Sequence, residues 1–161
     1  MKKLPFYLKI ISFCLLLFIW DYIFINYKKL PLSVPIYFDW AGKPAFFAPR
    51  EIIWFLAGAA SVIYLLIFYL TRNINSPLLK MPRNIKKNRR RAEQIVSVFH
   101  LIIMLLLTII TYESVAVGVG KTDALSPVAS YLIILLIIAV VFLLLYSYYL
   151  AKKSFLKAPV S

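Results

Sequence analysis

Residues 52–71 read IIWFLAGAASVIYLLIFYLT and contain no charged side chain. The hydrocarbon core of a bilayer is about 30 Å thick, and an α-helix crosses it in about 20 apolar residues. Three other runs of the chain share this character: about 7–27, 94–117 and 128–151. Their only charged side chains are Lys9, Asp21 and Glu113. The sequence therefore predicts four membrane-spanning helices.

The composition leads to the same fold class. Hydrophobic residues make up 63% of the 161 residues, whereas a soluble domain is about half apolar. The excess is concentrated in the four runs, and no remaining stretch is long enough to bury a core of its own. We therefore expect residues 1–161 to form one integral membrane domain, an all-α bundle of four transmembrane helices. The basic start is followed by no small-residue cleavage site, which favours an uncleaved first span.

The distribution of charge predicts the orientation of the chain. Lys and Arg number 19 against 6 Asp and Glu, and most of them flank the termini or lie in the loop 72–93. Short basic loops stay in the cytoplasm. Both termini and the loop 72–93 are therefore expected inside, with the loop 28–50 and the turn 118–127 outside.

The basic loop 72–93 allows two interpretations. Its cations can contact anionic lipid head groups, each contributing about 1 kcal/mol near the membrane surface, or they can form a docking site for nucleic acid or protein. Pro77 and Pro82 interrupt any helix there, and no aromatic side chains are interleaved to stack on bases. We favour anionic lipid as the partner of this loop and expect no nucleic acid.

The loop 28–50 has an unusual composition, and residues 30–44 read LPLSVPIYFDWAGKP. Loops of this length are usually functional or disordered, and its apolar side chains favour an ordered structure. Asp39 and Gly42 have turn chemistry, because Asp bonds nearby backbone and Gly permits positive φ. Residues 34–40 can form a short strand. We therefore expect a rigid cap rich in proline and aromatic residues at the outer membrane face.

The order of motifs in this loop resembles a known family. Leu30-Pro31, Val34-Pro35, Phe38, Gly42-Lys-Pro44 and a basic Arg50 that opens a span are similar to the domain of unknown function 1648. The resemblance implies a module of the bacterial inner membrane that also occurs in immunity proteins of the Sdp type, which act as membrane receptors. The sequence departs from the pattern at Tyr37, where histidine is frequent, at Ala45, where an acidic residue is common, and at residues 48–50. The departures argue against a metal or an acid–base pair in the loop.

Two groups of candidate binding residues follow from the sequence. The first group, in the loop, is expected to bind a peptide, a lipid or a membrane partner: Leu30, Pro31, Pro35, Tyr37, Phe38, Asp39, Trp40, Gly42 and Pro44. The second group is a polar cluster at the outer ends of the spans: Asp21, Asn26, Arg50, Glu51, Tyr112 and Glu113. This cluster can line a polar chamber with Tyr22, or its carboxylates can simply pair with Arg50, Lys121, Lys28 or Lys29.

The sequence predicts no catalytic centre, metal site or cofactor. One histidine and one cysteine give no recognisable zinc or haem spacing. We expect His100 to be a neutral imidazole that is bonded to a tyrosine hydroxyl between helices. Two carboxylates without a nucleophile or a second type of base do not specify a reaction.

Three functions therefore remain open. The favoured one is a non-enzymatic binding or immunity-like module that acts through the loop 28–50. The second is an enzyme or transporter that uses Asp21 and Glu113 in an outer-leaflet chamber. The third is an accessory subunit that packs against a larger complex through the small residues of Ala57–Ser61.

Overall fold

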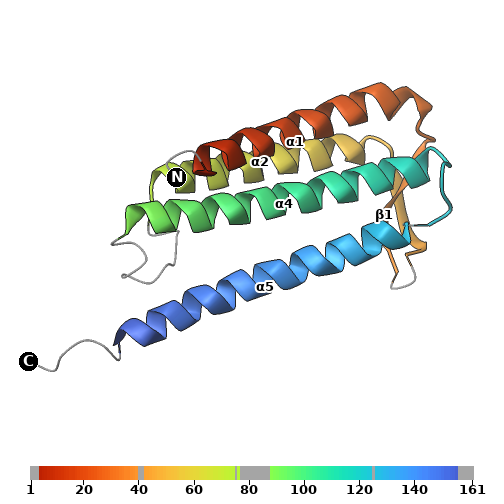
Figure 1. The fold of residues 1–161 in the computed structure, drawn as a ribbon. Coiled ribbons are helices and arrows are strands. Elements are labelled where there is room, and N and C mark those ends of the chain that lie inside the picture. The colour runs from red at the N-terminus through yellow and green to blue at the C-terminus, as the bar shows by residue number, and fades with distance from the viewer. Residues whose placement is uncertain (1–3, 40–41, 75, 77–87, 125, 156–161) are drawn as a thin grey trace, which may run out of the picture.

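The computed structural model describes residues 4–39, 42–74, 76, 88–124 and 126–155 (Figure 1). Its elements are α1 (Leu4–Asn26), the 3₁₀ turn η1 (Tyr27–Lys29), β1 (Ser33–Phe38), β2 (Pro44–Pro49), α2 (Ile52–Arg72), α4 (Arg89–Gly118) and α5 (Pro127–Phe155). Three of these segments are long and apolar enough to cross a membrane, namely Leu4–Lys29, Ile52–Arg72 and Arg89–Gly118. In α5 the described apolar stretch is Ser130–Phe142. The structure thus contains three candidate membrane-spanning helices, in agreement with the predicted membrane character, and the fourth span stays a prediction.

Helix α4 lies at the centre of the arrangement. It packs against α1, α2, β1 and α5, and α1 also packs against α2. We call the end of the bundle that holds β1 and β2 the hairpin end, and the end that holds Arg72 and Arg89 the basic end. Figure 1 shows that α5 begins beside α4 at the hairpin end and diverges from α4 toward the C-terminus of α5.

Small residues allow the helices to approach one another. Ala57 and Ala60 of α2 are fully buried, and the Ser61 hydroxyl accepts a hydrogen bond of 2.9 Å from Trp20 Nε1 of α1. Small side chains are typical of helix interfaces in membranes. The predicted small-residue face Ala57–Ser61 therefore packs, at least in these positions, within the chain itself.

Helix α4 begins at Arg89, before its apolar run. Asn88 caps it, because its Oδ1 accepts a hydrogen bond of 3.3 Å from Arg91 N–H. Most of the basic loop, including Pro77 and Pro82, lies outside the described residues. Its proposed contact with anionic lipid stays a prediction.

The loop 28–50 forms an antiparallel β-hairpin, in which Ser33 pairs with Pro49 and Phe38 with Pro44. The turn has the predicted chemistry. Asp39 O accepts from Gly42 N–H at 2.9 Å, Asp39 Oδ1 accepts from Lys43 N–H at 2.8 Å, and Gly42 has a φ of 75°. A glycine in the left-handed region after a tight turn is typical of three-residue hairpin loops. Trp40 lies outside the described residues.

The second strand corrects the expectation of a purely helical fold. The sequence PAFFAP lacks polar alternation and carries a proline at each end, features that argue against a strand. In the structure the prolines are the first and last residues of β2, where a missing N–H costs least. The fold is therefore mostly helical with a small two-stranded sheet.

Candidate functional site

The hairpin packs closely on the end of α4 at Gly118. A Cβ atom added to Gly118 would lie 2.9 Å from Leu30 Cδ2 and 3.4 Å from Val34 Cγ1. Leu30 and Val34 are buried, and so is Pro35. A larger residue would require the end of the Leu30 side chain to move, so Gly118 lets Leu30 and Val34 pack closely on α4. The sequence offered no signal for this role beyond a glycine at the end of a span.

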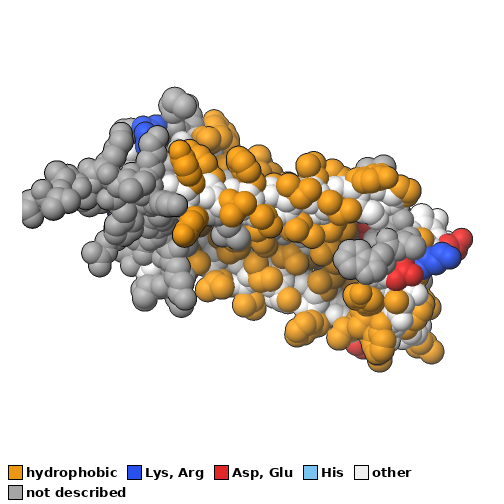
Figure 2. All heavy atoms as spheres, turned by 90° about the horizontal axis from the view of Figure 1, so that it is seen from below, with side chains coloured by type: hydrophobic (Ala, Val, Ile, Leu, Met, Phe, Trp, Pro, Cys, Tyr) orange, Lys and Arg blue, Asp and Glu red, His pale blue; other side chains and the backbone are white. Residues whose placement is uncertain are grey.

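Other positions of the hairpin expose large apolar side chains. Tyr37 is 59% exposed, Phe46 61% and Phe47 54%, and Leu32 and Ile36 are exposed as well. Figure 2 shows hydrophobic side chains over one face of the helices, with acidic and basic side chains at the hairpin end and a Lys or Arg side chain at the opposite end. Exposed aromatic side chains on a rigid support are typical of recognition surfaces.

The predicted loop residues divide between buried and exposed positions. Leu30, Pro35 and Gly42 are buried and support the hairpin. Phe38 and Pro44 are partly buried, whereas Pro31, Tyr37 and Asp39 are exposed. The aromatic residues Phe46 and Phe47 were missed as candidates, because β2 was not expected to pair with β1.

Arg50 and Glu51 connect the hairpin to α2. The backbone N–H of Arg50 donates to Leu32 O at 3.0 Å, and its guanidinium lies 5.3 Å from the centre of the Tyr27 ring. Arg50 Nε is 3.6 Å from Glu51 Oε1. The Tyr27 ring in turn packs on Trp54 of α2 at 5.2 Å. These residues hold the hairpin in place.

Glu113 is buried and ties α4 to the start of α5. Its carboxylate accepts hydrogen bonds from Ser126 N–H at 3.0 Å and from Ser126 Oγ at 2.9 Å. Because α5 begins at Pro127, the carboxylate lies at a helix N-terminus, where negative charge is favourable. Glu113 thus has a structural partner that the sequence did not predict.

Tyr112 of the predicted cluster contacts Tyr22, the residue that the predicted chamber would add to it. The rings of Tyr22 and Tyr112 stack with centres 5.1 Å apart, and Asn26 Nδ2 donates to Tyr22 O at 2.8 Å. The Tyr22 hydroxyl is buried without a hydrogen-bond partner among the residues that the structure describes. The described structure therefore brings Tyr22 and Tyr112 together on facing helices.

Asp21 lies elsewhere. It is exposed on α1 and lines a shallow groove on the outer surface of that helix. In the described part of the chain it forms no ion pair, and Arg50 pairs with Glu51 instead. Neither the chamber with two carboxylates nor the simple pairing of Asp21 with Arg50 is seen.

A second polar cluster lies near the basic end. Lys9 Nζ is 2.6 Å from Glu93 Oε1, which joins α1 to α4. His100 is fully buried, and its ring centre is 4.8 Å from that of Tyr64. The ring nitrogens of His100 and the Ser97 hydroxyl have no hydrogen-bond partner within the described residues. His100 thus contacts a tyrosine as predicted, but through the rings rather than through a hydrogen bond.

No group of three His, Cys, Asp or Glu side chains that would hold a metal ion occurs within the described ranges. The Lys9–Glu93 pair was not predicted, because a lysine in the first span and a glutamate at the end of the loop 72–93 do not by themselves indicate a contact.

The chain matches no protein-family model, and no curated protein or solved structure shows significant similarity to it. The resemblance to the domain of unknown function 1648 therefore stays a prediction.

Proposed function

We propose that this chain is a small integral membrane binding module whose hairpin recognises a peptide or the exposed part of another membrane protein. The observation that supports this most is the exposure of three aromatic side chains on the hairpin, Tyr37, Phe46 and Phe47. The hairpin itself is packed on α4 at Gly118. A surface that is rigid before binding loses little conformational entropy on binding.

The proposal includes a topology of four spans. Helix α5 contains 29 residues, enough to cross a bilayer, and would be the fourth. The cations concentrated near residues 72–93 and the termini would lie in the cytoplasm. The hairpin would then face the outside of the bacterial inner membrane, where a secreted peptide or a neighbouring protein can reach it.

The arrangement of the carboxylates supports binding over catalysis or transport. Both carboxylate oxygens of Glu113 accept hydrogen bonds from Ser126, and Asp21 is exposed on the outer surface of α1. A reaction that used both groups would need them to converge on one substrate. The resemblance of the Leu-Pro, Phe, Gly and Pro positions to immunity proteins adds an immunity-like role as one form of this binding.

Photocrosslinking in the cells that express the protein tests the proposal. A photoreactive phenylalanine analogue replaces Phe46 in one variant and Leu65 in another. The two side chains are similarly exposed, at 61% and 63%. Leu65, however, lies in the middle of the apolar helix α2. We expect Phe46 to capture one defined peptide or protein and Leu65 to capture lipid. The captured product should decrease when Tyr37→Ala or Phe47→Ala is added.

A result in which both positions yield the same lipid adducts would overturn the proposal. The aromatic side chains would then anchor the hairpin at the membrane interface, where Tyr and Trp are enriched. Capture of a protein that does not depend on Tyr37 and Phe47 would contradict it equally.

A further inference from the structure

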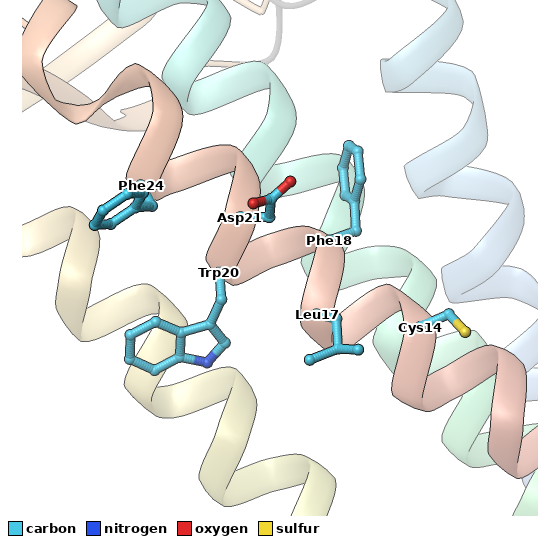
Figure 3. Close-up of a pocket in the computed structure, with 6 residues that line it drawn as sticks. All are labelled: Cys14, Leu17, Phe18, Trp20, Asp21 and Phe24. Carbon is cyan, nitrogen blue, oxygen red and sulfur yellow. The ribbon is translucent and has the colours of Figure 1, made fainter.

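The exposed Asp21 lies in a groove on α1 that has no part in the proposed binding of a partner by the hairpin. The groove is shallow and open, and its lining residues all belong to α1: Cys14, Leu17, Phe18, Trp20, Asp21 and Phe24. Figure 3 shows the Asp21 carboxylate with Phe18 and Phe24 on either side of it. Asp21 lies within the segment Leu4–Lys29, which is long and apolar enough to cross a membrane.

The lining residues are spaced as in a helix-packing seam. Cys14, Leu17, Asp21 and Phe24 follow one another at intervals of three, four and three residues. This alternation is the spacing at which one helix packs along another at a small crossing angle. Leu17 and Phe24 are 53% and 73% exposed, so the seam is uncovered within the described structure.

One wall of the groove is fixed by the fold. Trp20 Nε1 donates to Ser61 Oγ at 2.9 Å, and the Trp20 ring packs against Trp54 at 5.9 Å. Because α2 holds this indole, the groove has a defined shape before anything binds to it.

The carboxylate determines the chemistry of the occupant. Asp21 has no ion-pair or hydrogen-bond partner in the part of the chain that the structure describes. A charged side chain on an apolar surface at this depth is costly unless an opposite charge pairs with it. An occupant that is apolar along its length and carries one cation beside Asp21 satisfies both the seam and the carboxylate.

A second copy of this chain does not supply that cation. A second copy in the same membrane would place the hairpin-end halves of its helices at the level of Asp21. No Lys or Arg occurs in these halves, which are residues 16–26, 52–62, 105–118 and 127–140. A parallel pair of α1 helices would place one Asp21 near the other, and like charges repel. The cation must therefore come from a different chain.

We propose that the α1 groove is the docking site for a transmembrane helix of another protein that carries one Lys or Arg at the level of Asp21. The helix packs along Cys14, Leu17 and Phe24, and its cation pairs with the Asp21 carboxylate. This surface is separate from the exposed aromatic residues of the hairpin, so the two proposals are tested by different experiments.

The single cysteine of the chain provides the probe, because Cys14 is exposed in the same seam, two helical turns from Asp21. The full chain is reconstituted in phosphatidylcholine vesicles with a leucine-rich transmembrane peptide. The peptide has a central cysteine and a lysine seven residues away, and a matched peptide has leucine in place of the lysine. Oxidation then traps neighbouring cysteines as a disulfide, whose yield is measured.

We expect the lysine peptide to crosslink with Cys14 about tenfold more than the leucine peptide, the ratio that a modest interhelical polar contact gives. Asp21→Asn should remove most of this difference. As a control, Cys14→Ser is combined with Leu135→Cys on α5, which is similarly exposed but has no acidic neighbour in the apolar stretch. That variant should crosslink equally with both peptides.

Equal yields of the two peptides with Cys14 would overturn the proposal, as would a lysine preference that survives Asp21→Asn. The cation beside Asp21 could also be the ammonium group of a lipid. Native mass spectrometry after reconstitution with phosphatidylethanolamine tests this alternative. Retention of this lipid by the wild type but not by Asp21→Asn, without any preference for the lysine peptide, would assign the groove to lipid and refute a protein helix.

Discussion

Helices α4 and α5 have nearly the same length, 30 and 29 residues, but α4 lies at the centre of the fold and α5 at its periphery. Met104 and Val115 of α4 are fully buried, whereas Leu135 and Phe142 of α5 are 60% and 66% exposed. The helix with the more apolar sequence is therefore the peripheral one. A lipid-exposed helix gains nothing from polar side chains, whereas a central helix can satisfy them against its neighbours.

The buried polar residues of the chain follow the same division. Of the eight buried polar side chains among the described residues, five lie on α4: Ser97, His100, Thr111, Glu113 and Ser114. Some are satisfied locally, as when Thr111 Oγ1 donates to Leu107 O at 2.7 Å, and Glu113 is satisfied by the start of α5. Polar residues in an apolar run thus indicate which helix lies inside.

The largest expected effect that tests this contrast comes from truncating one buried and one exposed side chain. Met104→Ala should lower the free energy of unfolding in mixed micelles by about 2–4 kcal/mol, because it leaves a cavity at the centre of the bundle. Leu135→Ala on α5 should change it by less than about 0.5 kcal/mol. Equal losses for the two variants would show that α5 is packed as tightly as α4.

A smaller effect is expected where the two helices are joined. Glu113→Ala removes two hydrogen bonds to a charged acceptor and should weaken the attachment of α5 by about 1–3 kcal/mol. Spin labels on cysteines placed at Ile110 and Ile138, in a Cys14→Ser background, should report a broader distance distribution between α4 and α5.

Glu113→Gln serves as the matched control, because its side-chain oxygen still accepts a hydrogen bond from Ser126. It should broaden the distribution less than Glu113→Ala. An unchanged distribution in Glu113→Ala would mean that packing, rather than this contact, positions α5.

The smallest effect is expected at the Lys9–Glu93 pair, which ties α4 to α1. The two side chains are 19% and 32% exposed, so solvent weakens their interaction. Lys9→Met should cost about 1 kcal/mol in the same unfolding assay, and the added change Glu93→Gln should recover part of the loss. No change in either variant would show that the pair does not contribute to the position of α4.

Much of the fold follows from local features of the sequence. The predicted span 52–71 corresponds to α2 at Ile52–Arg72, and the predicted span 94–117 lies within α4 at Arg89–Gly118. The turn at Asp39 and Gly42 was also predicted, because its backbone geometry depends on the two residues themselves. In each case the determining interaction is between a residue and its solvent or its neighbours in sequence.

The sequence by itself determined the apolar segments, the clustering of cations and the turn, since hydrophobicity and backbone preference are properties of short stretches. Tertiary structure alone decided that Phe46 and Phe47 pair with β1, that Gly118 admits Leu30, and that Ser126 satisfies Glu113. Tertiary structure also decided that Asp21 is exposed while Glu113 is buried, although both are lone carboxylates near the end of an apolar run. The reason is physical: which face of a helix is covered depends on the helices packed against it, and those contacts join residues far apart in the chain.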